Sequence, residues 1–429
     1  MTKDGLSRRR FVALGAVAGA SLLTGGILAG CGNGSTGGSA PGGNGGAEVD
    51  LNDFNACLEA ARGTTVNWYQ WGGDERINNW VHTAVADYLL ANHEITINLV
   101  PQDDTVAVIT KLLDEKSQGI ETGSVDLIWV NGENFLTAKE NGLFTGPITE
   151  GLPNYDAYVD SSSDLNNYDF GVPVEGLETP YARAIFVFIN DAALTPEAPK
   201  NTAELLEYAK KYPGKVSYPA PPDFTGSVFV RQIAYDIVGY EALAAAGTDK
   251  EALRTALGPA IDYLNELKPY LWNEGKSYPA SSGQQENMFA DGELVLHMAY
   301  DPNTVASLIE QGTLPDSCRD FAFDSGMIGN TSFLAMPINA PNKPGTIVAI
   351  NALLSPELQA SKEDISNWGA ANVLEYDRLD ASQKELFDRL PQGIGAIPAK
   401  ELAPTMQPEL VAGAVPLIEE IWIEDVAQQ

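Results

Sequence analysis

Hydrophobic residues recur every three or four positions between Asp74 and Ala91, and this spacing predicts a helix with one face in a core. Strands and helices alternate around it, with strands expected at 65–71, 95–100 and 125–130 and helices at 105–118 and 131–142. Alternation of this kind predicts a parallel sheet covered by helices.

The pattern changes after residue 155 and then resumes. Residues 155–168 are rich in Asp, Ser and Asn, which predicts a long surface loop. A β-type run at 184–190 begins a second series of strands and helices. Another extended run covers 331–337, and the chain after residue 361 is mainly helical. The chain is therefore expected to hold two α/β units.

Residues 218–227 combine a short strand, a proline-rich turn and the start of a helix. A helix N-terminus carries unpaired N–H groups and a partial positive charge, so a polar or anionic ligand group can bind there. The alternative is an ordinary connection that is capped by its own Thr or Asp side chain. If Asp223 satisfies the helix end, its outer oxygen is expected to stay free for a ligand amine or hydroxyl.

Composition narrows the possible functions. The chain has 429 residues, 44% of them hydrophobic, and a formal charge of −32, so it lacks the basic surface that nucleic-acid binding requires. Its three histidines have no metal-ligand spacing, and no cofactor is expected. Cys57 and Cys318 form either a disulfide or two separate buried thiols.

Residues 1–30 read as a targeting segment. Residues 7–12 resemble a twin-arginine export motif, and residues 28–31 resemble the lipobox of bacterial lipoproteins, which implies cleavage before Cys31 and a lipid on its sulfur. A membrane-spanning anchor is the alternative. Residues 31–47 form a Gly- and Ser-rich tether, so the folded part is expected outside the cytoplasmic membrane.

Four segments carry a family resemblance: VNWYQWGG at 66–73, VDLIWVNGENF at 125–135, FGVP at 170–173 and YPAPPDFTGS at 218–227. With the export signal and the tether, they resemble the YnjB-like branch of the extracytoplasmic solute-binding proteins of ABC importers. The resemblance runs from about Thr65 to the C-terminus and departs mainly in the acidic loop around Asp164.

The resemblance implies a two-lobed type II periplasmic-binding-protein fold, each lobe a mostly parallel sheet flanked by helices. Lobe one would cover 48–183, lobe two 190–330, and residues 331–429 would return to lobe one and add C-terminal helices. It also implies delivery of a small solute to a membrane permease by a lipid-anchored protein, expected as a monomer.

Ligands of open parallel sheets bind beyond the carboxyl ends of the strands. This rule, together with position near the crossover between the lobes, selects the expected ligand residues: Trp71, Gly72, Gly73, Asn131, Gly132, Glu133, Asn134, Glu175, Tyr181, Asp223, Phe224, Thr225, Gly226, Ser227, Tyr300 and Asp301. No catalytic or metal residues are expected among them.

Several of these residues have structural alternatives. Trp71 could pack on its lobe, Glu133 and Asp301 could stabilise helix N-termini, and Glu175 could pair with Arg183 as a strut between the lobes. Arg231 is expected to pair with an acid on its own surface rather than to bind an anion.

Three function classes fit the chain. A solute-binding protein is favoured, an exported hydrolase that uses carboxylates such as Asp223 or Glu133 is the second, and a surface adhesin is the third. The carboxylates with Trp71 and Tyr300 favour a cationic or zwitterionic solute, with a carbohydrate as the alternative.

Overall fold

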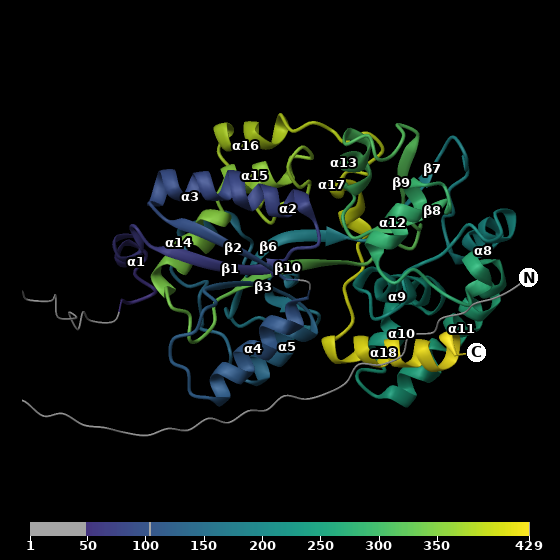
Figure 1. Ribbon diagram of the computed structural model, residues 1–429, viewed down its shortest axis with the longest axis horizontal. Coiled ribbons are helices and arrows are strands. Elements are labelled where there is room, and N and C mark those ends of the chain that lie inside the picture. Colours follow the sequence, from purple (N-terminus) through teal and green to yellow (C-terminus); the bar gives the residue numbers. More distant parts are fainter. Residues whose placement is uncertain (1–48, 103, 429) are drawn as a thin grey trace, which may run out of the picture. The chain divides into compact units, whose positions relative to one another are not determined.

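The computed structural model describes residues 49–102 and 104–428 (Figure 1). The predicted export signal, the lipid-anchor residue Cys31 and the tether lie outside the described residues. Within the described part, no helix is both long and apolar enough to cross a bilayer.

The first sheet has five strands in the order β2-β1-β3-β10-β6. These strands are β1 (Thr65–Trp71), β2 (Thr96–Gln102), β3 (Leu127–Val130), β6 (Glu178–Ile185) and β10 (Gly329–Ala335). Strand β1 pairs in parallel with β2 and β3, as the alternating pattern predicts, whereas β10 runs antiparallel to both of its neighbours. Strand β6 leads from the first sheet toward the second, and β10 leads back from the second sheet to the first, so the two strands run in opposite directions.

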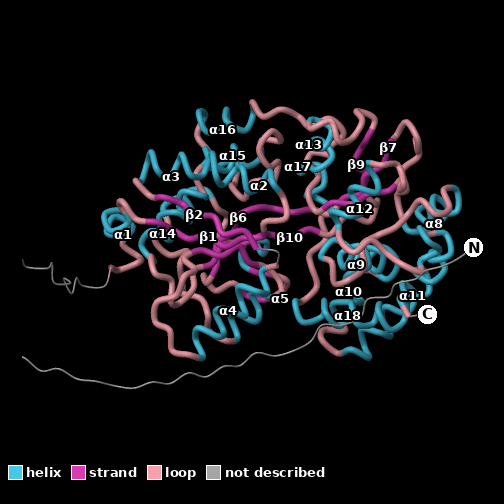
Figure 2. The backbone as a smooth tube through the Cα atoms, viewed as in Figure 1, coloured by secondary structure: helices cyan, strands magenta, loops and turns pink. Residues whose placement is uncertain are grey.

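Helices cover both faces of the first sheet (Figures 1 and 2). One face packs on α1 (Phe54–Ala61), α2 (Glu75–Trp80), α3 (Ala86–His93), α14 (Lys343–Leu353) and α15 (Pro356–Glu363). A π-helical turn, Val81–Val85, joins α2 to α3, so the helix predicted from Asp74 to Ala91 is present. The other face packs on α4 (Thr105–Ser117) and α5 (Glu133–Glu140).

The second sheet has three strands in the order β8-β7-β9: β7 (Val187–Asp191), β8 (Leu296–Ala299) and β9 (Cys318–Phe321). Strand β7 runs antiparallel to both neighbours, where the sequence analysis expects mostly parallel pairing. Strands β8 and β9 reach β7 only after several intervening helices, so the local pattern of the sequence does not give their direction relative to β7.

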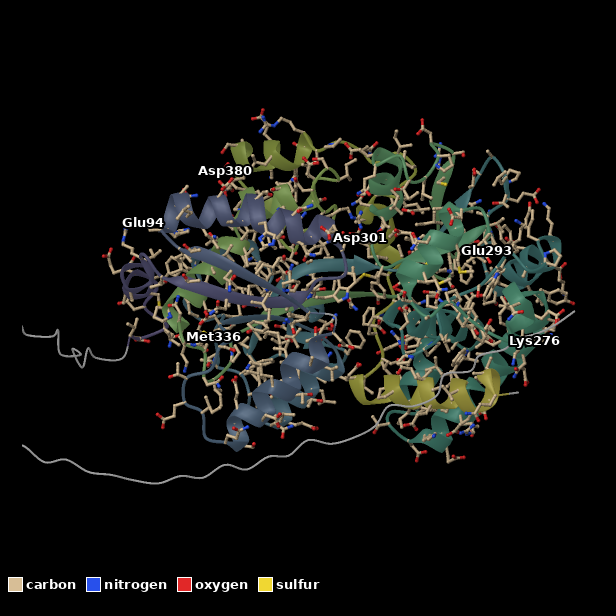
Figure 3. All side chains as sticks on the ribbon, viewed as in Figure 1. Glu94, Lys276, Glu293, Asp301, Met336 and Asp380 are labelled. Carbon is tan, nitrogen blue, oxygen red and sulfur yellow. The ribbon has the colours of Figure 1, made fainter. Side chains whose placement is uncertain are left out.

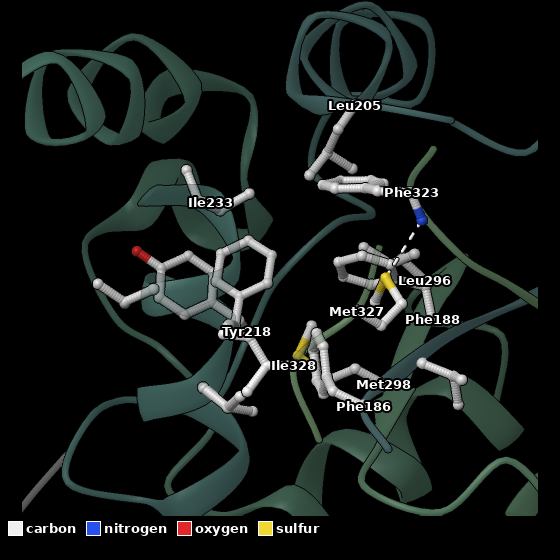
Figure 4. Packing of buried hydrophobic residues seen from close by; sticks show 14 of the residues in the cluster. Phe186, Phe188, Leu205, Tyr218, Ile233, Leu296, Met298, Phe323, Met327 and Ile328 are labelled. Carbon is white, nitrogen blue, oxygen red and sulfur yellow. Dashed lines mark hydrogen bonds between the residues drawn. The ribbon is translucent and has the colours of Figure 1, made fainter. Parts of the chain in front are cut away.

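The core around the second sheet is aromatic (Figure 4). Phe188 contacts Phe186, Phe229, Phe321 and Phe323 with ring centroids 4.9–6.2 Å apart. The helices that surround it are α8 (Thr202–Lys211), α9 (Phe224–Val238), α10 (Tyr240–Ala244), α11 (Lys250–Leu267), α12 (Ser282–Ala290), α13 (Thr304–Glu310), α17 (Ala399–Leu402) and α18 (Val415–Trp422).

Strands β6 and β10 connect the two cores. They pair over their whole length, with a register shift between Ser332 and Phe333. Tyr181 and Leu334 belong to the first core, while Ile185 and Ile328 belong to the second. The C-terminal residues of α18 pack in the second core, and the domain boundaries stay a prediction.

The segment from 153 to 173 differs from the predicted long surface loop. It contains α6 (Pro153–Tyr158), α7 (Asp164–Asn167) and the two-stranded hairpin β4 (Tyr168–Asp169) and β5 (Val172–Pro173). Asn166, inside the predicted loop, is only 1% exposed, so polar composition alone misled the prediction. Helix α16 (Ala381–Asp388) lies further along the chain.

The two described cysteines are free and buried in different cores. The disulfide alternative is therefore wrong, and the alternative of two separate thiols holds. Burial raises the pKa of Cys57 to about 11 and that of Cys318 to about 12, so neither thiol is ionised near neutral pH.

Candidate functional site

The carboxyl end of β1 presents an aromatic ring beside two glycines. Trp71 is 40% exposed, and its ring lies edge-on to Trp129 at 6.5 Å. A Cβ on Gly73 would come within 2.3 Å of the Trp71 ring, and one on Gly72 within 2.3 Å of Pro101. Gly72 is therefore required by close packing on Pro101 and Gly73 by close packing on the Trp71 ring, a reason that needs no ligand.

The turn after Gly73 carries a charged pair that sequence reasoning missed. Asp74 caps α2 by accepting from the Arg76 amide at 2.8 Å, and the Arg76 guanidinium forms an ion pair with the same carboxylate at 2.5 Å. One guanidinium nitrogen, Nη1, is buried with no hydrogen-bond partner among the described residues. The sequence signal that could have revealed this pair is an arginine placed two residues after an aspartate that caps a helix.

Two acids of the second core act electrostatically on this pair. The negative charges of Asp301 and Glu286 both raise the pKa of the Arg76 guanidinium. Burial raises the pKa of each of these carboxyls, and the positive charge of Arg76 opposes that rise. Burial raises the pKa of Asp301 to about 7, although its carboxylate accepts from the Asn303 amide at 2.9 Å. Figure 3 shows Asp301 in the region between α2 and α12.

The predicted loop 131–134 forms the N-terminus of α5. Gly132 has φ of 62°, and its amide donates to both oxygens of Asp169 at 2.8 and 3.0 Å. Glu133 is the exposed first residue of the helix, where a carboxylate interacts favourably with the helix dipole, while Asn131 and Asn134 are half-buried. Burial raises the pKa of Glu419 on α18, and the negative charge of Glu133 adds to this rise.

The loop before α9 is a structural cap. Asp223 Oδ1 accepts from the amides of Thr225 and Gly226 at 3.0 and 2.9 Å, and Oδ2 accepts from the Ser282 amide at 3.0 Å. The expectation that the outer oxygen of Asp223 is free is wrong, because that oxygen accepts from Ser282, the first residue of α12. Gly226 is also structural, since a Cβ there would come within 2.0 Å of the Pro219 carbonyl oxygen.

A buried polar chain begins at Ser227. Its hydroxyl donates to Glu419 at 2.6 Å and accepts from Arg231, whose guanidinium also forms a two-bond fork with Glu409 at 3.1 Å. Tyr300 donates to the same Glu409 at 2.6 Å. Both side chains of the Arg231–Glu409 pair are 1% exposed, so Arg231 pairs with an acid as expected, but in the interior and not on the surface.

Two predicted ligand residues lie apart from the strand ends. Glu175 is exposed and pairs with Lys139 at 3.1 Å, six residues along α5 from Glu133. Six residues of helix span about 9 Å, so Glu175 lies away from the carboxyl edge of the sheet. The proposed strut from Glu175 to Arg183 is wrong, because Arg183 donates to the carbonyl of Leu165 and to Asn166.

Tyr181 is fully buried in an aromatic cluster of the first core. Its ring contacts Trp68, Trp80, Trp129 and Trp368 at centroid distances of 5.6–6.3 Å. The buried Lys362 amine lies 5.2 Å from the centre of the Tyr181 ring and donates to the Tyr181 carbonyl and to Gln359.

The structure thus divides the predicted residues. On the first-core side, Trp71 and Gly73 precede α2, and Glu133 begins α5; Tyr300, Asp301 and the 46% exposed Phe224 belong to the second core. Direct bonds join the two sides at Asn303 to Gly369 and at Ala412 to Phe170. Glu286, Glu409 and Glu419 were missed because no local pattern marks an isolated acid as part of a site.

No group of three or more His, Cys, Asp or Glu side chains within the described residues is arranged to hold a metal ion. The site therefore offers carboxylates, one partly unpaired guanidinium and aromatic rings. These groups recognise a ligand by charge, hydrogen bonds and ring contacts.

Residues 83–372 match the family model of the bacterial extracellular solute-binding proteins. The chain belongs to this family. It is also 36% identical over 373 residues to the protein YnjB of Escherichia coli strain K12, across 86% of this chain and 93% of that protein. Family membership makes it the extracytoplasmic solute-binding component of an ABC importer and not an enzyme, with a small-molecule ligand and a membrane permease as its partners.

Solved structures show the same fold. The periplasmic binding protein AfuA of Actinobacillus pleuropneumoniae aligns with a TM-score of 0.56 at 14% identity, over 85% of this chain and 99% of that one. The spermidine/putrescine-binding protein PotD of Streptococcus pneumoniae aligns with a TM-score of 0.57 at 14% identity, over 84% and 98%. The predicted two-lobed α/β fold is confirmed.

Proposed function

We propose that this solute-binding protein captures a small solute with a cationic group between its two lobes. The observation that carries the proposal is the charge on the facing elements, which are α2 and α5 of the first lobe and α12, the turn before α13 and α18 of the second. Glu133, Glu286, Glu419 and Asp301 are all acids, whereas the one base of this set, Arg76, is already paired with Asp74. A solute that brings a positive charge would stabilise the ionised carboxylates on both lobes.

Exposed aromatic rings support the same class of solute. Trp71 and Phe224 are large hydrophobic side chains left 40% and 46% exposed, one on each lobe, and the Phe224 ring contacts that of Tyr300 at a centroid distance of 5.2 Å. Aromatic faces attract organic cations and cover the apolar parts of a solute. Phe224 and Trp71 are therefore the proposed walls of the site.

The fold by itself does not choose the solute. PotD is a spermidine/putrescine-binding protein, whereas the AfuA structure holds fructose-6-phosphate, a sugar phosphate. The local charge of this chain favours an amine of the first kind. Lobe closure around the solute would then precede its delivery to the permease.

Three further parts of the proposal rest on the sequence: the lipid anchor with its export route, the monomeric state and the lobe boundaries. Cys31 is proposed as the lipidated residue after twin-arginine export, which would hold a monomer at the membrane by the tether 31–47. The lobe boundaries are proposed near residues 183–190 and 330. Metabolic labelling with a fatty acid, compared between the wild type and Cys31→Ser, tests the anchor.

A thermal-shift screen of the mature chain tests the solute class. Spermidine, putrescine and thiamin are compared with neutral sugars, fructose-6-phosphate and sulfate at equal ionic strength. A ligand at 100 times its Kd should stabilise the fold by about 2.7 kcal/mol. An increase in Tm with sulfate or sugars alone contradicts the cationic solute.

Variants then locate the site. Glu133→Gln and Glu286→Gln each remove one carboxylate charge and should weaken amine binding roughly 10- to 100-fold, the usual range for a lost charge-assisted hydrogen bond. Glu175→Gln is the matched control, because it removes an exposed carboxylate that pairs with Lys139 away from the strand ends. Equal losses in all three variants would mean general charge attraction and no defined site.

A further inference from the structure

The hairpin of β4 and β5 has a turn that its own sequence does not favour. Asp169 pairs with Val172, so Phe170 and Gly171 form a two-residue loop, and their φ angles are 44° and 70°. A two-residue loop with two positive φ angles is usually Asn-Gly, because a bulky side chain fits this backbone poorly. Contacts outside the turn must therefore hold Phe170 in place, and residues held in this way often mark functional segments.

On one side, the tip of this hairpin packs on the first lobe. The Gly132 amide, at the start of α5, donates to both side-chain oxygens of Asp169 at 2.8 and 3.0 Å. The Phe170 ring is 4% exposed, and a Cβ on Gly132 would lie 3.7 Å from it. Leu136, one turn further along α5, packs on the same cluster. The tip thus supports the start of α5, where the sequence analysis predicts the ligand loop 131–134.

On its other side, the tip meets a segment of the second lobe. The Phe170 carbonyl accepts from the Ala412 amide at 2.9 Å. A Cβ on Gly171 would lie 3.0 Å from Val411 Cγ1, so the two segments are in close contact. The Phe170 side chain also forms a small buried cluster with Ala412 and with Val415, the first residue of α18. Phe170 therefore contacts both lobes.

Segment 411–415 is anchored in the second lobe on both sides. Before it, Glu409 forms the buried two-bond fork with Arg231, and Leu410 lies 1% exposed in the core around the second sheet. After it, the rest of α18 packs in the same core. The segment therefore moves with the second lobe, whereas α5 moves with the first. A change in the lobe arrangement has to strain or break the contacts at Phe170.

We propose that the hairpin tip, residues 169–171, is a clasp between the lobes that by itself favours the lobe arrangement described here. Its grip consists of the Phe170 ring and the hydrogen bond from the Ala412 amide. Strands β6 and β10 are permanent covalent links, whereas the clasp is reversible. Because Asp169 joins the tip to Gly132, release of the clasp also frees the start of α5. The inference does not depend on which solute binds between the lobes.

Spin labels on the mature chain test the clasp with no solute added. Cys31→Ser removes the lipid-anchor cysteine, and labels are attached at Leu90→Cys on α3 and Leu194→Cys after β7. These two positions are 59% and 63% exposed, one on each lobe, whereas Cys57 and Cys318 are buried and stay unlabelled. Double electron–electron resonance then gives the distribution of distances between the lobes.

Phe170→Asn is the decisive variant. It removes the ring, but Asn suits the positive φ of the turn, so the hairpin should still form. We expect a broader distance distribution, or a second distance, relative to the wild type. Ala412→Pro should have the same effect, because it removes the N–H donor at the start of a short helix, after a Val411 backbone that accepts a following proline. Tyr168→Asn is the matched control, since Tyr168 is a 46% exposed ring of the same hairpin, and it should leave the distribution unchanged.

Three results would overturn the clasp. The first is an unchanged distribution in Phe170→Asn, and the second is an equal change in Tyr168→Asn, which would mean general loosening of the hairpin. The third concerns Gly171→Cys combined with Val411→Cys, whose Cβ atoms would lie 3.7 Å apart, within the range for a disulfide. Failure of this pair to bond under mild oxidation contradicts the contact. Circular dichroism verifies folding, and if Ala412→Pro fails to fold, Phe170→Asn and the cysteine pair decide the question.

Discussion

The buried Lys362 should make the stability of the protein depend on pH in a defined window. Its side chain is fully buried in the first lobe, and burial lowers the pKa of the amine from 10.5 to about 7. The neutral amine has two N–H groups, and two acceptors, the Tyr181 carbonyl and Gln359, receive them. The neutral form therefore fits the site without a stranded donor.

The sign of the effect follows from proton counts. Between about pH 7 and pH 10.5 the unfolded chain keeps a proton on Lys362, whereas the folded chain has lost it. Stability therefore rises with pH across this window. The difference between 10.5 and about 7, at roughly 1.36 kcal/mol for each pH unit, gives about 5 kcal/mol as an upper bound.

Lys362→Met isolates this contribution. Urea unfolding of wild type and variant is measured at intervals from pH 7 to pH 10.5, and the difference between their free energies of unfolding is plotted against pH. The free energy of unfolding of the wild type should rise by several kcal/mol relative to that of the variant between pH 7 and pH 10.5. Lys276→Met is the control, because Lys276 is 69% exposed, and its difference from wild type should be nearly flat. A flat difference for Lys362→Met would refute the assignment of a neutral buried amine.

Two other substitutions test the interpretation of the second lobe. Asp223→Ala removes the cap of α9 and the acceptor of the Ser282 amide at the start of α12. It should cost about 1–2 kcal/mol of stability while leaving solute affinity unchanged, as urea unfolding and calorimetry can measure. Arg231→Met should cost about 3–5 kcal/mol, because it strands the buried Glu409, and adding Glu409→Leu should recover most of that loss. Additive losses in that double variant would show that the two side chains do not act as a pair.

Much of the fold could be predicted from local pattern. The periodic apolar residues from Asp74 to Ala91 and the apolar run that ends at Val130 form the expected helix and strand. The antiparallel β10 could not be read in this way, because its partners β3 and β6 lie about 150–200 residues earlier in the chain, and no local propensity encodes that pairing.

The site was less predictable than the fold. The strand-end rule selected Trp71 and Glu133, but it could not show that Ser282, 59 residues away, fills the second oxygen of Asp223. Asn166 stood in a segment whose polar composition suggested solvent, yet it is buried, and its amide donates to the Asp160 carbonyl. Such residues are found only when distant segments are brought together.

The interleaving of the two cores has a consequence for how the chain folds during synthesis. The core around the second sheet contains Phe186 and Phe188 but also Ile418, Trp422 and Val426, from the last helices of the chain. Trp422 donates to the Tyr218 hydroxyl at 3.1 Å, across 204 residues of sequence. Domains usually complete folding from the N-terminus as they leave the ribosome. Here the second lobe cannot close its core until residues 418–426 have been made, so its nascent chain exposes apolar surface longer than that of a protein with contiguous domains.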